Sequence, residues 1–495
     1  MGATGEPEIV SVAQGRLRGR RDGDVVAFLG VPFAAPPFGA NRLRPPAAVP
    51  AWDGVRPATE FGPTVPKTDY VAMYVPLFPE VTIAGEECLN LNVWAPADGG
   101  GGLPVLVWIH GGAFTNGSNS VPEYDGSAFA RNGIVTVAVN YRLAAEGFLY
   151  TGEDPANLGL LDQVAALEWV RDNIAAFGGD PQRVTVAGES AGAWSVNTLL
   201  AMPRAAGLFR QAISQSGGAH HWLQPEQGLL VARELAAALG VPPTRAGFAG
   251  LAPDRIALAC RDLITEVQTT PDPAKWGDLA LTQQPYAPTV DGEVLPRPTL
   301  EAIAAGDGAD VPLLIGTTAE EARLILVAAG VIDLIDDDAL AQAAAGYGLP
   351  AEAIATYRAN RPQAGPGDIL SAIVSDWYFR IPSIRVAEAR ARHTGDTWMY
   401  RFDWASPVLG SGHGVDIPFA FDTLASPGLE PRLGADPPQA VADTTHRIWV
   451  DFVTKGEPGW AAYDTTGRAT ALISETLRNA GDPGGDERVW WEGRR

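Results

Sequence analysis

Short apolar runs with almost no polar alternation are the clearest pattern in the first half of the chain. They occupy residues 103–109, 134–139 and 184–187. Uniformly apolar strands are expected where helices cover both faces of a sheet, as in most parallel sheets. The runs therefore predict buried strands of a mainly parallel sheet.

A helix is predicted between the second and the third of these runs. Apolar residues recur there at helical spacing, and a glycine follows the last of them. The residues concerned are Leu160, Leu161, Val164, Leu167, Val170, Ile174, Phe177 and the terminating Gly178. Alternation of strand, helix and strand predicts the α/β class, with helices on both faces of a mainly parallel central sheet.

The start of the chain has the pattern of antiparallel β-structure. Residues 9–12 and 15–19 are strand candidates, and residues 25–28 follow the turn Asp22-Gly23-Asp24. An Asp-Gly pair between such runs is a hairpin signal.

Beyond residue 225 the pattern is less regular. Ala-rich helical stretches at 229–239 and 339–345 alternate with Pro-rich loops, and strand candidates lie at 311–315 and 397–402. No Ser/Gly-rich linker, internal repeat or low-complexity block divides the chain. We expect a single domain over 1–495, with inserted segments, mainly within 225–400, that cap its active face.

Composition and charge change this picture by excluding partners. The 495 residues are 46% hydrophobic, which is enough for a large core, and the net charge is −22. An acidic chain is repelled by nucleic acid and by anionic membrane surfaces, so neither is an expected partner. The oligomeric state is left open.

The N-terminus and the cysteines bear on the compartment. Residues 1–6 have neither a basic nor an apolar signal region, and no run approaches membrane-spanning length. Only Cys88 and Cys260 are present, which fits free thiols in a reducing compartment better than a disulfide framework. We therefore expect a cytoplasmic protein.

A G-x-S-x-G motif marks a candidate nucleophile. Gly188-Glu189-Ser190-Ala191-Gly192 directly follows the strand 184–187 and precedes an Ala/Leu-rich run. This strand–turn–helix context is that of a nucleophile elbow, on which the side chain of Ser190 is expected to be exposed, and the helix N-terminus favours a developing oxyanion. Because the motif alone is also found in ordinary turns, Ser190 needs further support.

That support comes from a second glycine-rich loop. His110-Gly111-Gly112 directly follows the strand 103–109. An HGG-type loop after a strand supplies backbone N–H groups to the oxyanion hole. The candidate donors are Gly112, Ala113 and Ala191, and the two motifs together favour a serine hydrolase.

The chain also resembles the type-B carboxylesterase/lipase family, which includes bacterial carboxylesterases and the cholinesterases. Ordered matches run over nearly its whole length: residues 28–34, 42–46, 86–93, 139–142, 157–163, 188–192, 214–217 and 288–292. The resemblance implies the α/β-hydrolase fold and hydrolysis of small-molecule carboxylic esters through an acyl-enzyme intermediate, without a cofactor or a metal.

His413 is the candidate general base among the six histidines. A serine hydroxyl needs a base beside it, and imidazole can take and return the proton near neutral pH. In α/β-hydrolases the chain order is serine, acid, histidine. His413 lies in a Gly-rich loop after a strand, and it resembles the family's histidine motif H-x-x-E/D-[LI]-P-[FY]. The other histidines precede the serine, follow it too closely or belong to helices: His110, His220, His221, His393 and His446.

The catalytic acid is expected between Ser190 and His413 in the sequence, at the end of a strand. The strand candidate 311–315 leads into Gly316 and then Glu320-Glu321-Ala322. The resemblance places Glu321 on the catalytic acid, with Glu320 as the second candidate. The sequence departs from the family in having Ala322 where glycine is usual.

The resemblance also places other side chains around the site. Glu189, Ser216 and Asp416 are expected beside the triad, where they would orient His413 and tune its basicity. Crowded carboxyls in a dry pocket raise one another's pKa, so we expect Glu189 and Asp416 to share a hydrogen-bonded network, directly or through Ser216 and water.

Three aromatic residues are expected in the substrate pocket: Phe114, Trp194 and Trp222. The bulk of Trp194 and Trp222 is expected to favour short or aromatic acyl groups.

Other functions share parts of these motifs. An amidase or carbamate hydrolase would use the same triad, and a non-catalytic binding relative would lack the serine or the histidine, both of which are present. A cholinesterase is disfavoured because no cysteine precedes Cys88 and no tryptophan lies in 61–85. Neither H-E-x-x-H nor C-x-x-C occurs, so no metal is expected.

Overall fold

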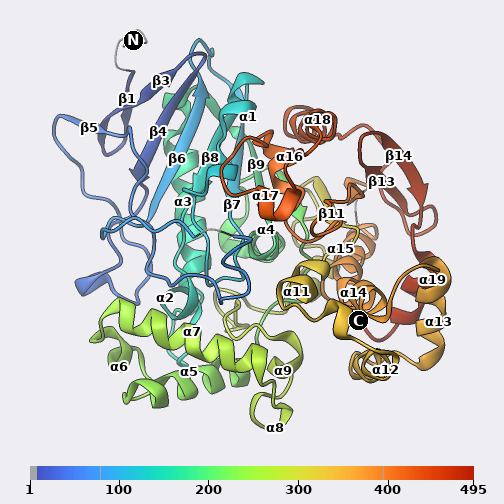
Figure 1. The fold of residues 1–495 in the computed structure, drawn as a ribbon. Coiled ribbons are helices and arrows are strands. Elements are labelled where there is room, and N and C mark those ends of the chain that lie inside the picture. The colour runs from blue at the N-terminus through green and yellow to red at the C-terminus, as the bar shows by residue number, and fades with distance from the viewer. Residues whose placement is uncertain (1–7, 79, 394) are drawn as a thin grey trace.

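A sheet of eleven strands forms the centre of the molecule in the computed structural model, which describes residues 8–78, 80–393 and 395–495 (Figure 1). The strand order is β14-β13-β12-β11-β10-β9-β7-β8-β6-β4-β3. The pairs from β13 to β8 are parallel, and those at the two edges are antiparallel. This confirms the predicted mainly parallel sheet. A separate three-stranded sheet has the order β1-β2-β5.

The strands are β1 (Ile9–Val12), β2 (Gly15–Arg18), β3 (Arg20–Asp22), β4 (Val25–Pro32), β5 (Val55–Pro57), β6 (Asn90–Pro96), β7 (Leu103–Ile109), β8 (Val135–Val139), β9 (Gly179–Glu189), β10 (Gln211–Gln215), β11 (Leu313–Thr318), β12 (Thr397–Phe402), β13 (Ala469–Ile473) and β14 (Leu477–Gly481). The α-helices are α1 (Ser127–Arg131), α2 (Ala144–Phe148), α3 (Leu158–Asn173), α4 (Ala191–Ala201), α5 (Pro225–Leu239), α6 (Arg245–Ala249), α7 (Pro253–Thr269), α8 (Pro273–Trp276), α9 (Leu279–Thr282), α10 (Thr299–Ala304), α11 (Arg323–Ala328), α12 (Asp337–Gly346), α13 (Ala351–Asn360), α14 (Pro366–Ser375), α15 (Ile381–Arg390), α16 (Ile417–Phe421), α17 (Glu430–Leu433), α18 (Gln439–Lys455) and α19 (Gly485–Arg488). Short 3₁₀ turns are η1 (Gly39–Asn41), η2 (Pro122–Tyr124), η3 (Ile174–Phe177), η4 (Pro203–Ala205), η5 (Ile332–Leu334) and η7 (Val489–Trp491), and η6 (Asp376–Arg380) is a π-helical turn.

Each face of the sheet has its own hydrophobic core, because successive side chains of a strand point to opposite faces. In β7, Val105 and Val107 pack into the core that contains α3, α4 and α15. Leu106 and Trp108 pack into the other core, with α1, α16 and α18. Helices therefore cover both faces, which explains why this strand is apolar throughout.

The elements read from the sequence are present, with small shifts at their ends. The Asp-Gly turn joins β3 to β4 as an antiparallel hairpin, with Gly23 at φ 58°. The helix predicted to stop at Gly178 is α3 followed by the 3₁₀ turn η3, and Gly178 has φ 85°. The strand predicted at 311–315 begins later, at Leu313, since Pro312 has no N–H to donate to a ladder.

The irregular second half of the chain supplies helices around one end of the sheet. Helices α5–α10 lie between β10 and β11, and α11–α15 lie between β11 and β12. In Figure 1 the helices α5–α9, in green, gather below the sheet, and α11–α14 lie beside them. Residues from α7 and α11 line a cavity with Ser190, so these insertions face the carboxyl ends of the parallel strands.

The cysteines and the helices can be compared with the expectations about the cellular compartment, whereas the N-terminus cannot. Cys88 and Cys260 are both buried and free of disulfide bonds, as predicted. None of the helices in the described ranges combines the length and hydropathy that a bilayer crossing requires. Residues 1–6, on which the expectation of no signal segment rests, lie outside the described residues.

Candidate active site

The turn after β9 holds Ser190 in a strained conformation. Ser190 has φ 56° and ψ −121°, a region that residues with a side chain rarely adopt. Gly188 and Gly192 are needed on either side: a Cβ on Gly192 would overlap the carbonyl oxygen of Ile109, and one on Gly188 would overlap Gly192. The strand and helix α4 thus pin the serine at the carboxyl edge of the sheet.

Ser190 is less open than a residue on a surface turn. Its exposed fraction is 8%, whereas the motif led us to expect an exposed side chain. The reason is that the elbow lines a cavity that is walled by the loops at 66–78 and 111–124 and, in part, by the inserted segments. Ser190 is reached through this cavity.

Backbone N–H groups converge on the same place. Gly112 and Ala113 have positive φ values of 105° and 54°, and a Cβ on Gly112 would overlap the carbonyl oxygen of Asn116. Within the described ranges, neither N–H group has a hydrogen-bond acceptor. Ala191 is the first residue of α4, so its N–H also lacks an intrahelical partner. Gly112 and Ala113 line the cavity with Ser190, which is the arrangement that an oxyanion hole requires.

Glu321, and not Glu320, contacts His413. Glu321 Oε2 lies 2.6 Å from His413 Nδ1, and Glu321 Oε1 accepts a hydrogen bond of 2.8 Å from the Thr318 N–H. Glu320 instead accepts from the Ser411 N–H at 2.9 Å. Ala322 has φ −75°, so the position that is glycine in the family does not need glycine here.

The other side of the imidazole faces Glu189 and the cavity. His413 Nε2 lies 3.1 Å from Glu189 Oε1, and Ser190, Glu189 and His413 all line the cavity. Between Ser190 and His413 the described residues show no hydrogen bond. Catalytic hydrogen bonds are often long without substrate and tighten when it binds.

Burial and like charges raise the pKa values of the carboxyls around His413. Desolvation and the neighbouring Asp416 and Glu321 raise the pKa of Glu189 to about 8, against the favourable charge of His413. Desolvation and the charge of Glu321 raise the pKa of Asp416 to about 6. Burial alone would lower the pKa of His413, but the carboxylates of Glu189 and Glu321 outweigh it and raise that pKa to about 9. Protonation of Glu189 removes one of these charges, so the protons of Glu189 and His413 are linked.

The side chains beside Glu189 leave buried polar atoms without partners. Ser216 Oγ and Asp416 Oδ1 are buried and form no hydrogen bond within the described ranges, and Glu189 Oε1 forms none there besides its 3.1 Å ion-pair contact with His413 Nε2. Asp416 Oδ2 accepts from Gln215 Nε2 at 3.2 Å. A direct hydrogen bond between Glu189 and Asp416 is therefore not the arrangement seen, and the link through Ser216 and water stays a prediction.

The cavity has a volume of about 360 Å³ and an aromatic wall. Trp194 lines it, as expected, but Phe114 and Trp222 do not. Phe114 is fully buried behind the oxyanion loop, where its ring packs 4.6 Å from that of Phe148. Trp222 packs against the hydrophobic core. Other aromatic residues supply the lining: Tyr70, Tyr74, Phe78, Tyr124, Tyr378 and Phe379.

Two of these lining residues were not predicted from the sequence. Tyr378 and Phe379 belong to the π-helical turn η6, and the Phe379 ring lies 4.7 Å from the His413 ring. The Tyr378 ring lies 4.9 Å from that of His221, which stacks 3.8 Å from Trp194. Helical periodicity does not reveal a π turn, so no pattern in the sequence singles these residues out. Within the described residues, no group of His, Cys, Asp and Glu side chains is placed to hold a metal ion.

Comparisons with known proteins agree with this geometry. Residues 6–473 match the model of the Carboxylesterase family. The para-nitrobenzyl esterase of Bacillus subtilis (strain 168) is 34% identical, over 97% of this chain and 98% of that protein. The liver carboxylesterase of Sus scrofa is 32% identical, over 94% of this chain and 89% of that protein.

A solved structure is similar over the same extent. The Geobacillus stearothermophilus carboxylesterase EST55 at pH 6.2 superposes with a TM-score of 0.86 at 36% identity, covering 98% of this chain and 99% of that one. The fold is thus the α/β-hydrolase fold, as the sequence predicted. The chain belongs to the carboxylesterase family and is a serine hydrolase of small-molecule carboxylic esters.

Proposed function

We propose that Ser190, His413 and Glu321 are the catalytic triad of this esterase. The observation that carries the proposal is the 2.6 Å contact between His413 Nδ1 and Glu321 Oε2, with the opposite edge of the imidazole facing the cavity that Ser190 lines. In this role Glu321 holds the tautomer that has its proton on Nδ1 and its lone pair on Nε2. Glu320 has no part in the reaction.

The reaction then proceeds in two halves. Ser190 Oγ attacks the ester carbonyl while its proton passes to His413 Nε2, and the N–H groups of Gly112, Ala113 and Ala191 bind the oxyanion. His413 returns the proton to the departing alcohol, which leaves an acyl group on Ser190. A water molecule, deprotonated by His413, releases the acid and restores the serine.

We further propose that the acyl group lies against Trp194, Tyr378 and Phe379, and that the alcohol lies toward Tyr70 and Tyr74. The bulk of the first group favours short or aromatic acyl chains. The helices within 225–400 act as the cap of a single catalytic domain, which is supported by the cavity-lining residues of α7 and α11.

A cytoplasmic location and the absence of a nucleic-acid partner are also proposed. The two buried free thiols support the first, and the net charge of −22 supports the second.

A panel of nitrophenyl esters of increasing acyl length, combined with a serine-directed phosphonate, tests the proposal. We expect one phosphonate per chain on Ser190, and faster turnover of acetate and butyrate than of long-chain esters. Ser190→Ala should abolish both labelling and turnover. Ser195→Ala is the matched control, because Ser195 lies on the same helix but bonds to Gln163 at 3.0 Å.

The result that refutes the triad is ester turnover by Ser190→Ala close to that of the unmodified enzyme. Nitroanilides and carbamates in the same panel distinguish an amidase or carbamate hydrolase, which would turn them over faster than the esters. A non-catalytic relative would react with neither the esters nor the phosphonate.

A further inference from the structure

The wall beside His413 is built on an unusual piece of backbone. Helices α14 and α15 are joined by the π turn η6, in which the Ile381 N–H donates to the Asp376 carbonyl. π turns are rare and occur often at functional sites. Tyr378 and Phe379, which line the cavity, lie inside this turn. The shape of the cavity here therefore depends on how the turn is held.

An ion pair closes the turn at its two ends. Arg380 donates to both carboxylate oxygens of Asp376, at 2.5 Å from Nε and 2.7 Å from Nη2. The exposed fractions of the two side chains are 13% and 6%. Because Tyr378 and Phe379 lie between these residues, the forked pair fixes the backbone on either side of the wall.

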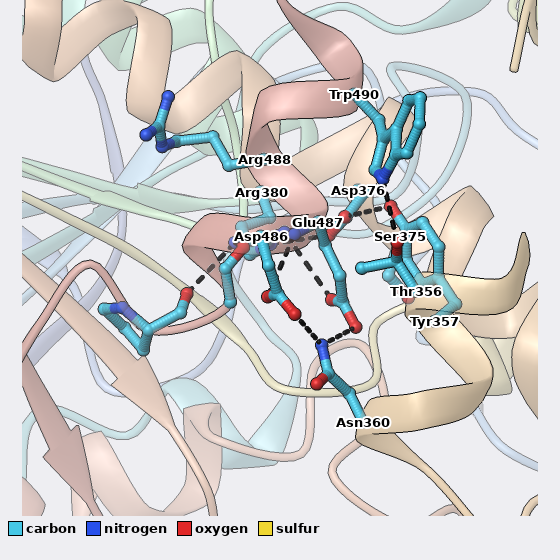
Figure 2. A network of polar contacts seen from close by, with 12 residues as sticks. Thr356, Tyr357, Asn360, Ser375, Asp376, Arg380, Asp486, Glu487, Arg488 and Trp490 are labelled. Carbon is cyan, nitrogen blue, oxygen red and sulfur yellow. Dashed lines mark hydrogen bonds and ion pairs between the residues drawn. The ribbon is translucent and has the colours of Figure 1, made fainter. Parts of the chain in front are cut away.

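A distant segment of the chain, which contributes no residue to the lining of the cavity, binds this pair. Arg380 Nη1 donates to the carbonyl oxygens of Pro483 and Gly484 at 3.1 and 3.3 Å, and its Nη2 lies 3.8 Å from Glu487 Oε2. Figure 2 shows Glu487 next to Arg380 and Asp376. We call Pro483, Gly484, Glu487 and Trp491 the clamp.

Tyr357, on α13, joins the clamp to Asp376. Its hydroxyl donates to Asp376 Oδ2 and accepts from Trp491 Nε1 at 2.8 Å. Tyr357 is fully buried, and Figure 2 shows it beside Asp376, on the far side from Arg488. The hydroxyl thus connects Trp491 of the clamp to Asp376 of the π turn, in addition to the direct contacts of Arg380.

We propose that Asp376 and Arg380, held by the clamp through Tyr357 and Glu487, are positioning residues that set acyl-chain selectivity. They touch no reacting atom. They hold Phe379 against His413 and Tyr378 against His221, and loosening them widens the cavity on the acyl side. This inference rests on the proposed function, because it takes Ser190 and His413 as the reacting groups.

Tyr357→Phe is the sharpest test, since it removes one hydroxyl and keeps the ring. We expect kcat/KM for nitrophenyl hexanoate relative to acetate to rise by about tenfold, because small displacements near the reacting groups have effects of that order or larger. The change should appear mainly in KM for the longer ester. A series of acetate esters with different alcohols should keep its order.

Tyr463→Phe is the matched control. Tyr463 is also buried, at 3% exposed, and its hydroxyl accepts a 2.6 Å hydrogen bond from Arg468 rather than joining the clamp. It should leave the acyl ratio unchanged, even if both variants melt at a lower temperature. If Tyr357→Phe does not fold, Glu487→Gln is measured in its place, with the same expected rise.

Rates are expressed per serine labelled by the phosphonate, which separates the two proposals. An unchanged acyl ratio in both Tyr357→Phe and Glu487→Gln, with full labelling of Ser190, overturns the clamp alone. A changed alcohol series with an unchanged acyl series overturns the assignment of this wall to the acyl group. Turnover by Ser190→Ala overturns the triad whatever the clamp variants do.

Discussion

Replacement of Glu189 by Gln tests how strongly this carboxyl acts on His413, the proposed general base. The variant keeps the shape of the side chain and removes its charge. Glu189 Oε1 lies 3.1 Å from His413 Nε2, and the side chains of Glu189 and His413 are only 5% and 13% exposed. A carboxylate there stabilises the protonated imidazole, which cannot accept the serine proton.

The size of the effect follows from Coulomb's law. At the 3.1 Å separation and an effective dielectric constant near 20, two unit charges interact by about 5 kcal/mol. This energy corresponds to an upper bound of roughly four units on the change in the pKa of His413. The raised pKa of Glu189, about 8, reduces this figure, because Glu189 carries a proton over part of the range in which His413 titrates. We therefore expect the pKa of His413 to change by about one unit or more in Glu189→Gln, where one unit is equivalent to about 1.4 kcal/mol.

The direction of the shift is fixed by the charges. The carboxylates of Glu189 and Glu321 raise the pKa of His413 to about 9, so the neutral, active base appears only as the pH rises. Removal of one carboxylate lowers that pKa, and the acidic limb of the pH–rate profile moves to lower pH. The plateau kcat should fall moderately, because a weaker base accepts the serine proton less readily.

The measurement is the pH dependence of kcat/KM for nitrophenyl acetate, corrected for hydrolysis without enzyme. Glu320→Gln serves as the control, since Glu320 bonds to the Ser411 N–H and does not contact His413. An acidic limb that stays in place, or moves to higher pH, in Glu189→Gln would refute the claim that Glu189 carries charge beside the base.

Two further predictions concern the acid and the thiols. Glu321→Gln should lower kcat by roughly 10³- to 10⁴-fold, as is typical when the acid that orients a catalytic histidine is neutralised. His413→Ala should be similarly impaired, whereas Glu320→Gln should lose little activity. Equal losses of activity at Glu320 and Glu321 would leave the acid unassigned. Cys88 and Cys260 are free, and burial raises the pKa of each thiol to about 12, so titration of the folded protein should find little reaction, whereas denatured, unreduced protein should show both thiols.

The sequence predicted the fold and the meeting of the candidate triad for one physical reason. Ser190 and Glu321 follow parallel strands, β9 and β11, and His413 follows β12 at a short distance. Carboxyl ends of parallel strands share one edge of the sheet, so residues placed there by their strands converge. The choice of Glu321 over Glu320 as the acid rested on the family resemblance, because two adjacent acids cannot be distinguished by composition or spacing. The structure has the 2.6 Å contact between His413 and Glu321.

What the sequence did not predict depends on contacts between distant segments. Phe114 was expected in the pocket, but it has φ 61° and its ring packs in the core against Phe148. Ser190 was expected to be exposed, but it lines a cavity to which segments far apart in the sequence contribute. The positions of Tyr378 and Phe379 depend on the π turn, which helical periodicity cannot signal.

The residues on turns after strands and the residues of the cavity wall also differ in what a substitution can change. The proposed triad lies on turns that follow buried strands, and a Cβ added at Gly188 or Gly192 would collide with backbone, so substitutions there should impair the reaction. The wall at Tyr378 and Phe379 is held instead by polar side chains, and the clamp that binds it lies more than a hundred residues further along the chain. Selectivity can therefore change through Tyr357 or Glu487 while Ser190, His413 and Glu321 keep their geometry. The quantity that reports on this part of the molecule is for that reason the ratio of rates between acyl chains, and not the rate on any one ester.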